Sequence, residues 1–142
     1  MMTSIHIAAE DLREARGKVV VITGGVGGIG KATSELFHSL GAKVVIGDLD
    51  QKAGDEFITV LGTARALFQV CDVTQWESLH LLFETAVKQF GRVDITIANA
   101  GVPEIEDIFD ERAGEDGKLM EPQYIVLDIN LKAILSSEYF SS

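Results

Sequence analysis

The chain has 142 residues, of which 46% are apolar and 24% charged, a composition typical of a globular domain. Its longest strongly apolar run covers only residues 19–22, whereas a membrane-spanning helix needs about 20 apolar residues. Residues 1–17 lack the apolar core of a secretory signal, and the single cysteine, Cys71, has no partner for an internal disulfide, so we expect a cytoplasmic protein. The 22 acids and 12 bases give a net charge of −10, which argues against nucleic acid as a partner.

Four short runs rich in β-branched residues alternate with segments of helical period. The runs are apolar on both faces and cover residues 18–23, 43–47, 65–70 and 93–98. Strands buried on both faces belong to parallel sheets that helices cover. The sequence therefore predicts an α/β fold, a doubly wound (Rossmann) parallel sheet of about four strands with flanking helices. We expect the carboxyl-terminal part of this fold to be missing, because the sequence ends near the helix that should lead to a fifth strand.

Helices are predicted between these strands and after the last one. The first covers residues 29–40, and its apolar residues form one stripe: Ile29, Ala32, Leu36, Phe37 and Leu40. The second, over residues 51–61, contains Gly54, which weakens it. The third, over residues 76–90, has a clear apolar stripe: Trp76, Leu79, Phe83, Ala86 and Phe90. A final helix is expected to begin at Pro122.

Residues 102–121 concentrate the negative charge. They hold eight acids and two bases, so this segment alone carries −6 of the net −10. We interpret it as a solvated loop, and an acidic surface that binds a partner is the alternative.

A glycine-rich turn, residues 23–30, lies directly after the first strand and before the first helix. Such a turn lets the backbone approach a pyrophosphate, whose negative charge is favoured by the N–H groups and the dipole at the helix start. A glycine string alone is also compatible with a tight turn that binds nothing. Asp48, at the carboxyl end of the second strand and 18 residues beyond Gly30, adds a second feature.

A carboxylate about 20 residues beyond the glycines accepts hydrogen bonds from ribose hydroxyls and repels a 2′-phosphate. No Lys or Arg occupies position 49 or 50, and residue 27 is glycine, so nothing close in the sequence would neutralise that phosphate. The glycine turn followed by Asp48 therefore favours NAD over NADP as cofactor. The alternative is that Asp48 simply ends a strand.

From Gly17 onward the chain resembles the classical short-chain dehydrogenase/reductase family. The turn at 23–30 is similar to the family's T-G-x-x-x-G-x-G, residues 71–74 to its acidic pair after the third strand, and residues 98–101 to its N-A-G at the end of the fourth. The extra glycine at 27 also satisfies the T-G-x-x-G-x-x-G of the extended branch. Residues 98–101 and Asn130 favour the classical branch.

The resemblance implies a cofactor site with four parts. The glycine turn would line the pyrophosphate, the end of the second strand would meet the adenosine ribose, the acidic pair would border adenine, and the N-A-G motif would lie under the nicotinamide-side ribose. The residues so implied are Gly24, Gly28, Ile29, Gly30, Asp48, Leu49, Asp72, Val73, Asn99, Ala100 and Gly101. A purely structural role, tying adjacent strands together, is the alternative for Asn99.

Asn130 is similar to the asparagine of the family's catalytic tetrad, which binds a water through its backbone and extends a proton path. Otherwise it is a polar residue at a helix cap or kink. The serine, tyrosine and lysine of the tetrad have no match, since Tyr124 is followed four residues on by Asp128 and Tyr139 lies three residues before the last. The histidines and Cys71 show no metal-ligand spacing, so no metal is expected.

The family's activity is hydride transfer between NAD(H) and an alcohol or carbonyl substrate. We interpret residues 18–142 as an incomplete NAD-binding Rossmann domain behind a tail at 1–17, and expect this chain to be inactive alone. The alternative is a catalytically inert module that binds NAD or heterodimerises. Because part of the sheet lacks cover, we expect a homo-oligomer or association with a full-length relative, and neither nucleic acid nor membrane as partner.

Overall fold

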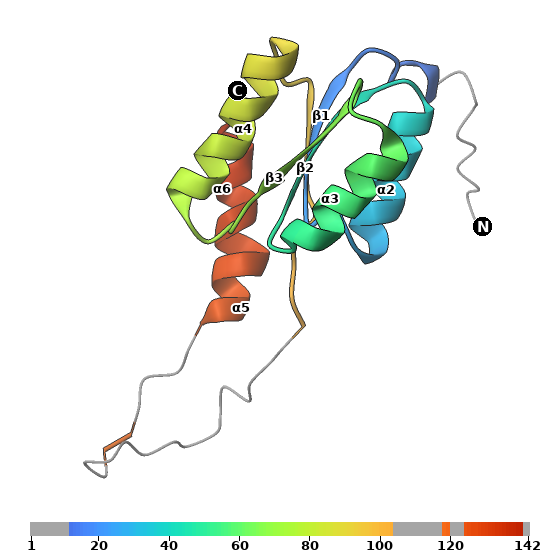
Figure 1. Cartoon of the computed structure of the whole chain (residues 1–142). Helices are drawn as coiled ribbons and strands as arrows, with labels where there is room; N and C mark the ends of the chain where they lie inside the picture. Colours follow the sequence, from blue (N-terminus) through green and yellow to red (C-terminus); the bar gives the residue numbers. More distant parts are fainter. Residues whose placement is uncertain (1–11, 104–117, 120–123, 141–142) are drawn as a thin grey trace, which may run out of the picture.

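The computed structural model describes residues 12–103, 118–119 and 124–140, in which a parallel β-sheet lies between two layers of helices (Figure 1). The strands are β1 (Val19–Thr23), β2 (Lys43–Asp48), β3 (Ala66–Val70) and β4 (Ile95–Ala98). The helices between them are α2 (Gly28–Ser39), α3 (Gln51–Leu61) and α4 (Trp76–Phe90). This architecture confirms the predicted α/β fold with a four-stranded parallel sheet.

The strand order, β3-β2-β1-β4, determines where a ligand site can form. The chain winds outward from β1 to β3 and then crosses back, so that β4 pairs with the other side of β1. All pairs are parallel, and the carboxyl ends of the four strands therefore share one edge of the sheet. Where the order reverses, the connections after neighbouring strands diverge and leave a crevice. Here the reversal lies between β1 and β4.

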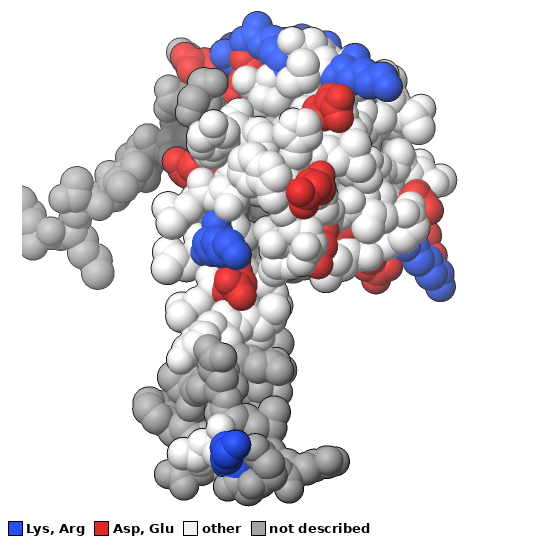
Figure 2. Space-filling view, turned by 90° about the vertical axis from the view of Figure 1, so that its left-hand side faces the viewer, with Lys and Arg blue, Asp and Glu red and all other residues white. Residues whose placement is uncertain are grey.

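The last described elements continue one another. A short helix, α5 (Ile125–Leu127), passes through a π-helical stretch, η1 (Asp128–Lys132), into α6 (Ala133–Tyr139). The α6 helix contacts β4 and buries two small residues, Ala133 and Ser137. Seen from the side of α4 and α6, the described surface is largely uncharged (Figure 2).

Two of the sequence predictions fall mainly on residues that are not described. The predicted helix start at Pro122 lies outside the described residues, and so does most of the acidic segment 102–121. Among the helices of the described ranges, none combines the length and the apolar character needed to cross a membrane.

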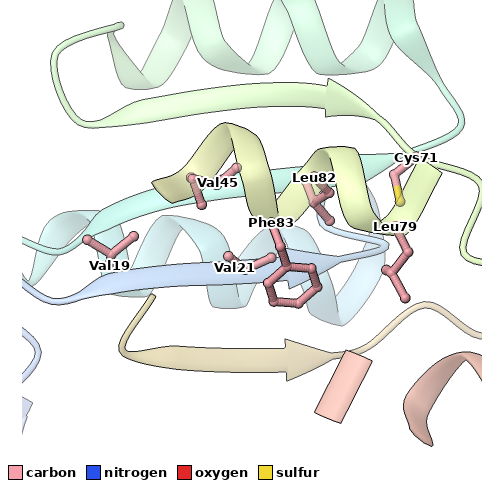
Figure 3. Packing of buried hydrophobic residues seen from close by; sticks show 8 residues of the cluster. Val19, Val21, Val45, Cys71, Leu79, Leu82 and Phe83 are labelled. Atoms are coloured by element: carbon pink, nitrogen blue, oxygen red, sulfur yellow. The ribbon is translucent and has the colours of Figure 1, made fainter. Parts of the chain in front are cut away.

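Each face of the sheet carries its own apolar core. The core toward α4 consists of Val19, Val21, Val45, Cys71, Leu79, Leu82, Phe83 and Ala86 (Figure 3). The core on the opposite face consists of Val20, Ile22, Ala42, Val44, Ile46, Phe57 and Ala66. Successive residues of a strand point to opposite faces, so β1 contributes alternately to both cores. Burial on both faces is the reason that this strand is an uninterrupted apolar run.

The predicted apolar stripe of α2 is wrong as a description of its buried face. Ile29 is 80% exposed and Leu36 is 49% exposed, whereas the residues that α2 buries are Gly30 and Ser34. Small residues are required because this helix approaches the end of β1 closely. A Cβ at position 30 would lie 2.0 Å from the carbonyl oxygen of Gly24.

The glycine that weakened the prediction of α3 has a packing role. A Cβ at Gly54 would lie 2.4 Å from ring atoms of Phe68 on β3, so glycine lets the helix lie directly against that ring. Gly54 is buried, and α3 spans the predicted residues. In α4 the predicted stripe is buried over most of its length, with Leu79 and Ala86 fully inaccessible.

Candidate functional site

A cavity of about 650 Å³ opens at the carboxyl edge of the sheet, where the strand order reverses. Its walls come from the turn after β1, the residues that follow β2, β3 and β4, and one residue of η1. Its volume lies within the range of about 300–1,000 Å³ that is usual for small-molecule and cofactor sites. Its position is the one at which doubly wound sheets bind ligands.

The turn after β1 packs so tightly that Gly24 and Gly30 leave no room for a side chain. Gly24 has a φ of +65°, and a Cβ there would lie 2.8 Å from the Cα of Ala100. Gly30 lies against the carbonyl group of Gly24, and a Cβ at Gly30 would lie 2.0 Å from that carbonyl oxygen. The Ser34 hydroxyl, which is buried, donates to the carbonyl oxygen of Gly30 at 2.9 Å and contacts that of Gly25 at 3.3 Å. These contacts hold the turn against the first part of α2.

The start of α2 presents backbone donors to the cavity. The first N–H groups of a helix have no acceptor within it, and the N-cap residue, Gly27, has no side chain that could supply one. Apart from their chain neighbours and the backbone of α2 itself, no atom lies within 4 Å of the points where a Cβ of Gly27 or Gly28 would stand. Open space, free donors and the positive end of the helix dipole together form a cradle for a phosphate group.

Two carboxylates lie at the end of β2. Asp48 accepts a hydrogen bond from the Val26 N–H through Oδ2 at 3.3 Å, which links β2 to the glycine turn. Its Oδ1 accepts from the Asp50 N–H at 3.4 Å. Asp50 in turn accepts from the Ala53 N–H at 2.9 Å and caps α3. A carboxylate has about four acceptor positions, so both side chains keep capacity for a ligand.

The residues after β3 add a third carboxylate and the only cysteine of the chain. Asp72 accepts through Oδ1 from the Thr74 N–H at 2.9 Å and from its hydroxyl at 2.7 Å. Burial raises the pKa of the Cys71 thiol to about 11, although a hydrogen bond with Ser78 acts in the opposite direction. Cys71 therefore contributes a neutral thiol to the cavity wall at pH 7 and is not an activated nucleophile.

Asn99 joins the end of β4 to the end of β1. Its Nδ2 donates to the carbonyl oxygens of Thr23 at 3.1 Å and Gly24 at 2.9 Å, and the Ala100 N–H donates to the Thr23 hydroxyl at 3.2 Å. This is the strand-tying arrangement weighed above as the alternative role of Asn99. Because Asn99 also lines the cavity, it holds in place the two strand ends between which the cavity opens.

The side chain of Asn130 binds the backbone and does not line the cavity. Its Oδ1 accepts from the Val102 N–H and its Nδ2 donates to the Val102 carbonyl, both at 2.9 Å. These two bonds tie η1 to the segment that leaves β4. The preceding residue, Ile129, lines the cavity. The water-binding backbone role implied by the family resemblance stays a prediction.

Ten of the eleven residues implied as a cofactor site line this one cavity, and the exception, Gly30, packs behind the turn. Seven further lining residues were not assigned to the site from the sequence: Val26, Gly27, Asp50, Ala53, Cys71, Val102 and Ile129. Most of them adjoin a predicted residue, and Asp50 could have been found as an acid just beyond a strand end. Ile129 could not have been found from the sequence, because its position in the cavity wall depends on how η1 folds against the sheet edge.

The surface of the cavity is partly apolar and, where charged, acidic. Two of its apolar side chains are largely uncovered, Ile29 at 80% and Leu49 at 67% exposure. The described residues that line it include three aspartates and no lysine or arginine. In the described ranges no group of three or more His, Cys, Asp or Glu side chains could hold a metal ion.

Fold and cavity together define a doubly wound, Rossmann-like α/β protein with its crevice at the reversal of strand order. A model of the short chain dehydrogenase family matches residues 18–137, and the chain belongs to this family. Members of the family use nicotinamide cofactors.

Individual relatives agree with this assignment. The chain is 45% identical over 134 residues to the short-chain dehydrogenase/reductase ascJ of Acremonium egyptiacum, covering 94% of this chain and 44% of that protein. It is 45% identical over 103 residues to tropinone reductase-like 1 of Erythroxylum coca, covering 72% of this chain and 36% of that protein.

A solved structure shows the same fold. The crystal structure of a short-chain dehydrogenase/reductase, glucose/ribitol dehydrogenase, from Brucella melitensis matches with a TM-score of 0.76 and 26% identity, over 89% of this chain and 51% of that one. The chain thus spans about half, or less, of the length of the proteins that it matches.

Proposed function

We propose that this chain is the NAD-binding part of a short-chain dehydrogenase/reductase whose activity is hydride transfer between NAD(H) and an alcohol or carbonyl substrate. One observation carries the proposal: the glycine turn and the Asp48 carboxylate face one cavity and are joined by the hydrogen bond from the Val26 N–H. A phosphate cradle beside a ribose acceptor is the combination that dinucleotide sites use.

The residues present fit such a cofactor. The open backbone at the start of α2 would hold the pyrophosphate, Asp48 would accept from ribose hydroxyls, and Asp72 would accept from the adenine amino group. The bound cofactor would cover the exposed side chains of Ile29 and Leu49. When bound, the cofactor supplies the hydride donor or acceptor. The chain's own residues bind it, orient it and exclude water from its contact surface.

Cofactor choice provides the first test. We expect the chain to bind NAD more tightly than NADP, because Asp48 would face a 2′-phosphate and no cationic residue is among the described lining residues. Asp48→Ala should weaken NAD binding about tenfold, since hydrogen bonds to a charged group contribute about 1.5–3 kcal/mol. It should weaken NADP binding less, because it also removes a repulsive charge.

Isothermal titration calorimetry measures both affinities. Asp55→Ala is the matched control, because Asp55 is an exposed acid of α3 that does not line the cavity. Equal affinities for NAD and NADP in the unsubstituted chain would contradict the choice of cofactor.

Catalysis provides the second test. We propose that the 142-residue chain alone shows no appreciable dehydrogenase turnover, because its sequence contains no match for the family's serine and Tyr-x-x-x-Lys pair. Positioned acid–base catalysis contributes about 10²- to 10⁴-fold, and misplaced substrate adds a further loss. NADH absorbance with secondary alcohols and ketones measures turnover. Activity that follows the purified chain and disappears on Gly28→Trp would contradict the proposal.

The second candidate function is an inert module that binds NAD or pairs with a full-length relative. An exposed apolar stripe along α5, η1 and α6 favours it, formed by Leu127, Leu131, Leu135 and Tyr139. Sedimentation velocity of the chain mixed with a longer family member distinguishes the two functions. We propose a cytoplasmic location, supported by the free thiol of Cys71 and tested by cell fractionation.

A further inference from the structure

We propose that Thr74 and Ser78 are positioning residues of the cavity, which hold the Asp72 carboxylate in one orientation and thereby make the chain select adenine over hypoxanthine. This inference rests on the proposed binding of NAD, in which Asp72 accepts from the adenine amino group. It predicts that the loss of either hydroxyl changes which base is bound, although neither Thr74 nor Ser78 is among the described residues that line the cavity.

Two hydrogen bonds hold one oxygen of the Asp72 carboxylate. Oδ1 accepts from the Thr74 N–H at 2.9 Å and from the Thr74 hydroxyl at 2.7 Å. A local turn in which an aspartate accepts from the residue two positions on restrains the rotation of its side chain. No residue of the described ranges donates to Oδ2, and Asp72 lines the cavity, so Oδ2 is the oxygen left for a ligand.

Ser78 holds the backbone of Asp72 from the first turn of α4. Its Oγ accepts from the Asp72 N–H at 3.0 Å, and a hydrogen bond joins its hydroxyl to the Cys71 thiol. The residues that flank this contact, Cys71 and Leu79, are both buried in the core toward α4 (Figure 3). Ser78 therefore fixes Asp72 against a part of α4 that is itself anchored in the core.

The restraint on Asp72 matters because adenine and hypoxanthine present different groups on the same edge. Adenine has an amino group, which donates, whereas hypoxanthine has a carbonyl oxygen in that place and an N–H on the adjacent ring nitrogen. A carboxylate held opposite the carbonyl oxygen meets a second acceptor, and such a site rejects the base because its polar groups are left unpaired. A carboxylate that is free to turn accepts from the adjacent N–H instead. The selection of adenine thus depends on the groups that keep Asp72 from turning.

The test uses the full 142-residue chain and calorimetric titration with NAD, its hypoxanthine analogue and its ethenoadenine analogue, in which a fused ring occupies both the amino group and the adjacent nitrogen. Thr74→Val removes the hydroxyl and keeps the backbone donor, and Thr74→Ser restores the hydroxyl. Ser78→Ala removes the acceptor of the Asp72 N–H. Thr59→Val is the matched control, because the Thr59 hydroxyl donates to a backbone carbonyl of α3 and Thr59 does not line the cavity.

We expect the unsubstituted chain to bind NAD at least about tenfold more tightly than the hypoxanthine analogue, the size of one hydrogen bond to a charged group. Thr74→Val and Ser78→Ala should each lower this ratio about fivefold, on the order of one neutral hydrogen bond, because the released carboxylate turns toward the hypoxanthine N–H. Thr74→Ser should keep the ratio, and Thr59→Val should change it less than about twofold, as a surface substitution does. A purely structural role would lower both affinities alike and leave the ratio unchanged.

The ethenoadenine analogue separates a turned carboxylate from a loosened cavity wall. It has no N–H for Asp72 to follow, so its affinity should not rise in any variant. Equal gains for the hypoxanthine and ethenoadenine analogues would overturn the inference, and an unchanged ratio in Thr74→Val or in Ser78→Ala would overturn the role of that residue.

One measurement does not depend on whether a variant folds. If the unsubstituted chain binds NAD and the hypoxanthine analogue equally well, the inference is overturned while the proposed function stands. Failure of the unsubstituted chain to bind both NAD and 5′-AMP would overturn the proposed function, and this inference with it.

Discussion

At the amino edge of the sheet, away from the cavity, a single side chain ties β4 to β1. Asp94 accepts from the Val19 N–H through Oδ2 at 2.8 Å, while its own N–H donates to the Val19 carbonyl at 2.8 Å. Burial acts to raise the pKa of Asp94, but the Val19 hydrogen bond, together with Arg92 and Lys18, outweighs burial and holds the pKa below its usual value. The folded state therefore favours the charged carboxylate.

This charge should stabilise the fold in a pH-dependent manner. A carboxyl group whose pKa is lower in the folded than in the unfolded chain stabilises the fold above its unfolded pKa, and the stabilisation disappears as the pH falls through the folded value. We expect Asp94→Asn to lower the free energy of unfolding by about 1 kcal/mol at pH 7, because the amide can still accept from Val19 but carries no charge.

Urea unfolding monitored by circular dichroism measures this difference at pH 7 and again near pH 3, where it should become smaller. Glu35→Gln, an exposed acid of α2, is the control and should be close to neutral at both values. A loss of stability for Asp94→Asn that does not change with pH would show that the charge is not responsible.

Among the described elements after β4, η1 is the one that reaches the cavity. Its π-helical turn is of a kind often found at functional sites, and it places Ile129 on the cavity wall. The next residue, Asn130, satisfies both the N–H and the carbonyl of Val102. One side chain thus holds η1 and the segment after β4 in register.

Asn130→Ala should release this segment. With the Val102 donor and acceptor unpaired, we expect a loss of about 1–3 kcal/mol in stability and hydrogen exchange at Val102 that is about tenfold faster. Hydrogen exchange with mass spectrometry, on a peptide covering residues 99–103, measures this effect. Leu135→Ala on α6 is the control, because Leu135 is 64% exposed. Unchanged exchange at Val102 would show that the two bonds do not restrain the segment.

At the scale of the whole molecule, one side presents an apolar stripe. Leu127, Leu131 and Leu135 repeat every four residues and are 54%, 55% and 64% exposed, and Tyr139 continues the series at 72%. On the side of α4 and α6, uncharged surface predominates and separate acidic and basic side chains are scattered over it (Figure 2). Exposed apolar surface of this kind favours association.

We therefore expect the isolated chain to be oligomeric at micromolar concentration. Leu131→Glu and Leu135→Glu together should weaken self-association at least about tenfold, because each places a charge in a surface that must be desolvated on binding. Sedimentation velocity measures the distribution of species. Val60→Glu is the control, since Val60 is 80% exposed on α3 in the opposite helix layer. A monodisperse monomer that unfolds sharply and reversibly would contradict this expectation.

The sequence alone determined the parallel α/β class, the positions of the four strands to within about two residues, and the glycine turn paired with Asp48. These features are local, since strand burial shows as continuous apolar runs and a phosphate-binding turn needs glycines at one short stretch of chain. Ten of the eleven residues that the family resemblance implied share one cavity, because parallel strands bring their carboxyl ends to the same edge.

Other features were decided only by tertiary structure, because they depend on distances between segments far apart in the chain. The buried face of α2 is set by the approach of Gly30 to Gly24, which periodicity cannot show, and Gly54 has meaning only against the Phe68 ring of β3. Ile129 lines the cavity only because η1 lies at the edge of the sheet. An apolar count along a helix identifies a stripe, but the shape of the neighbouring element determines which face is buried.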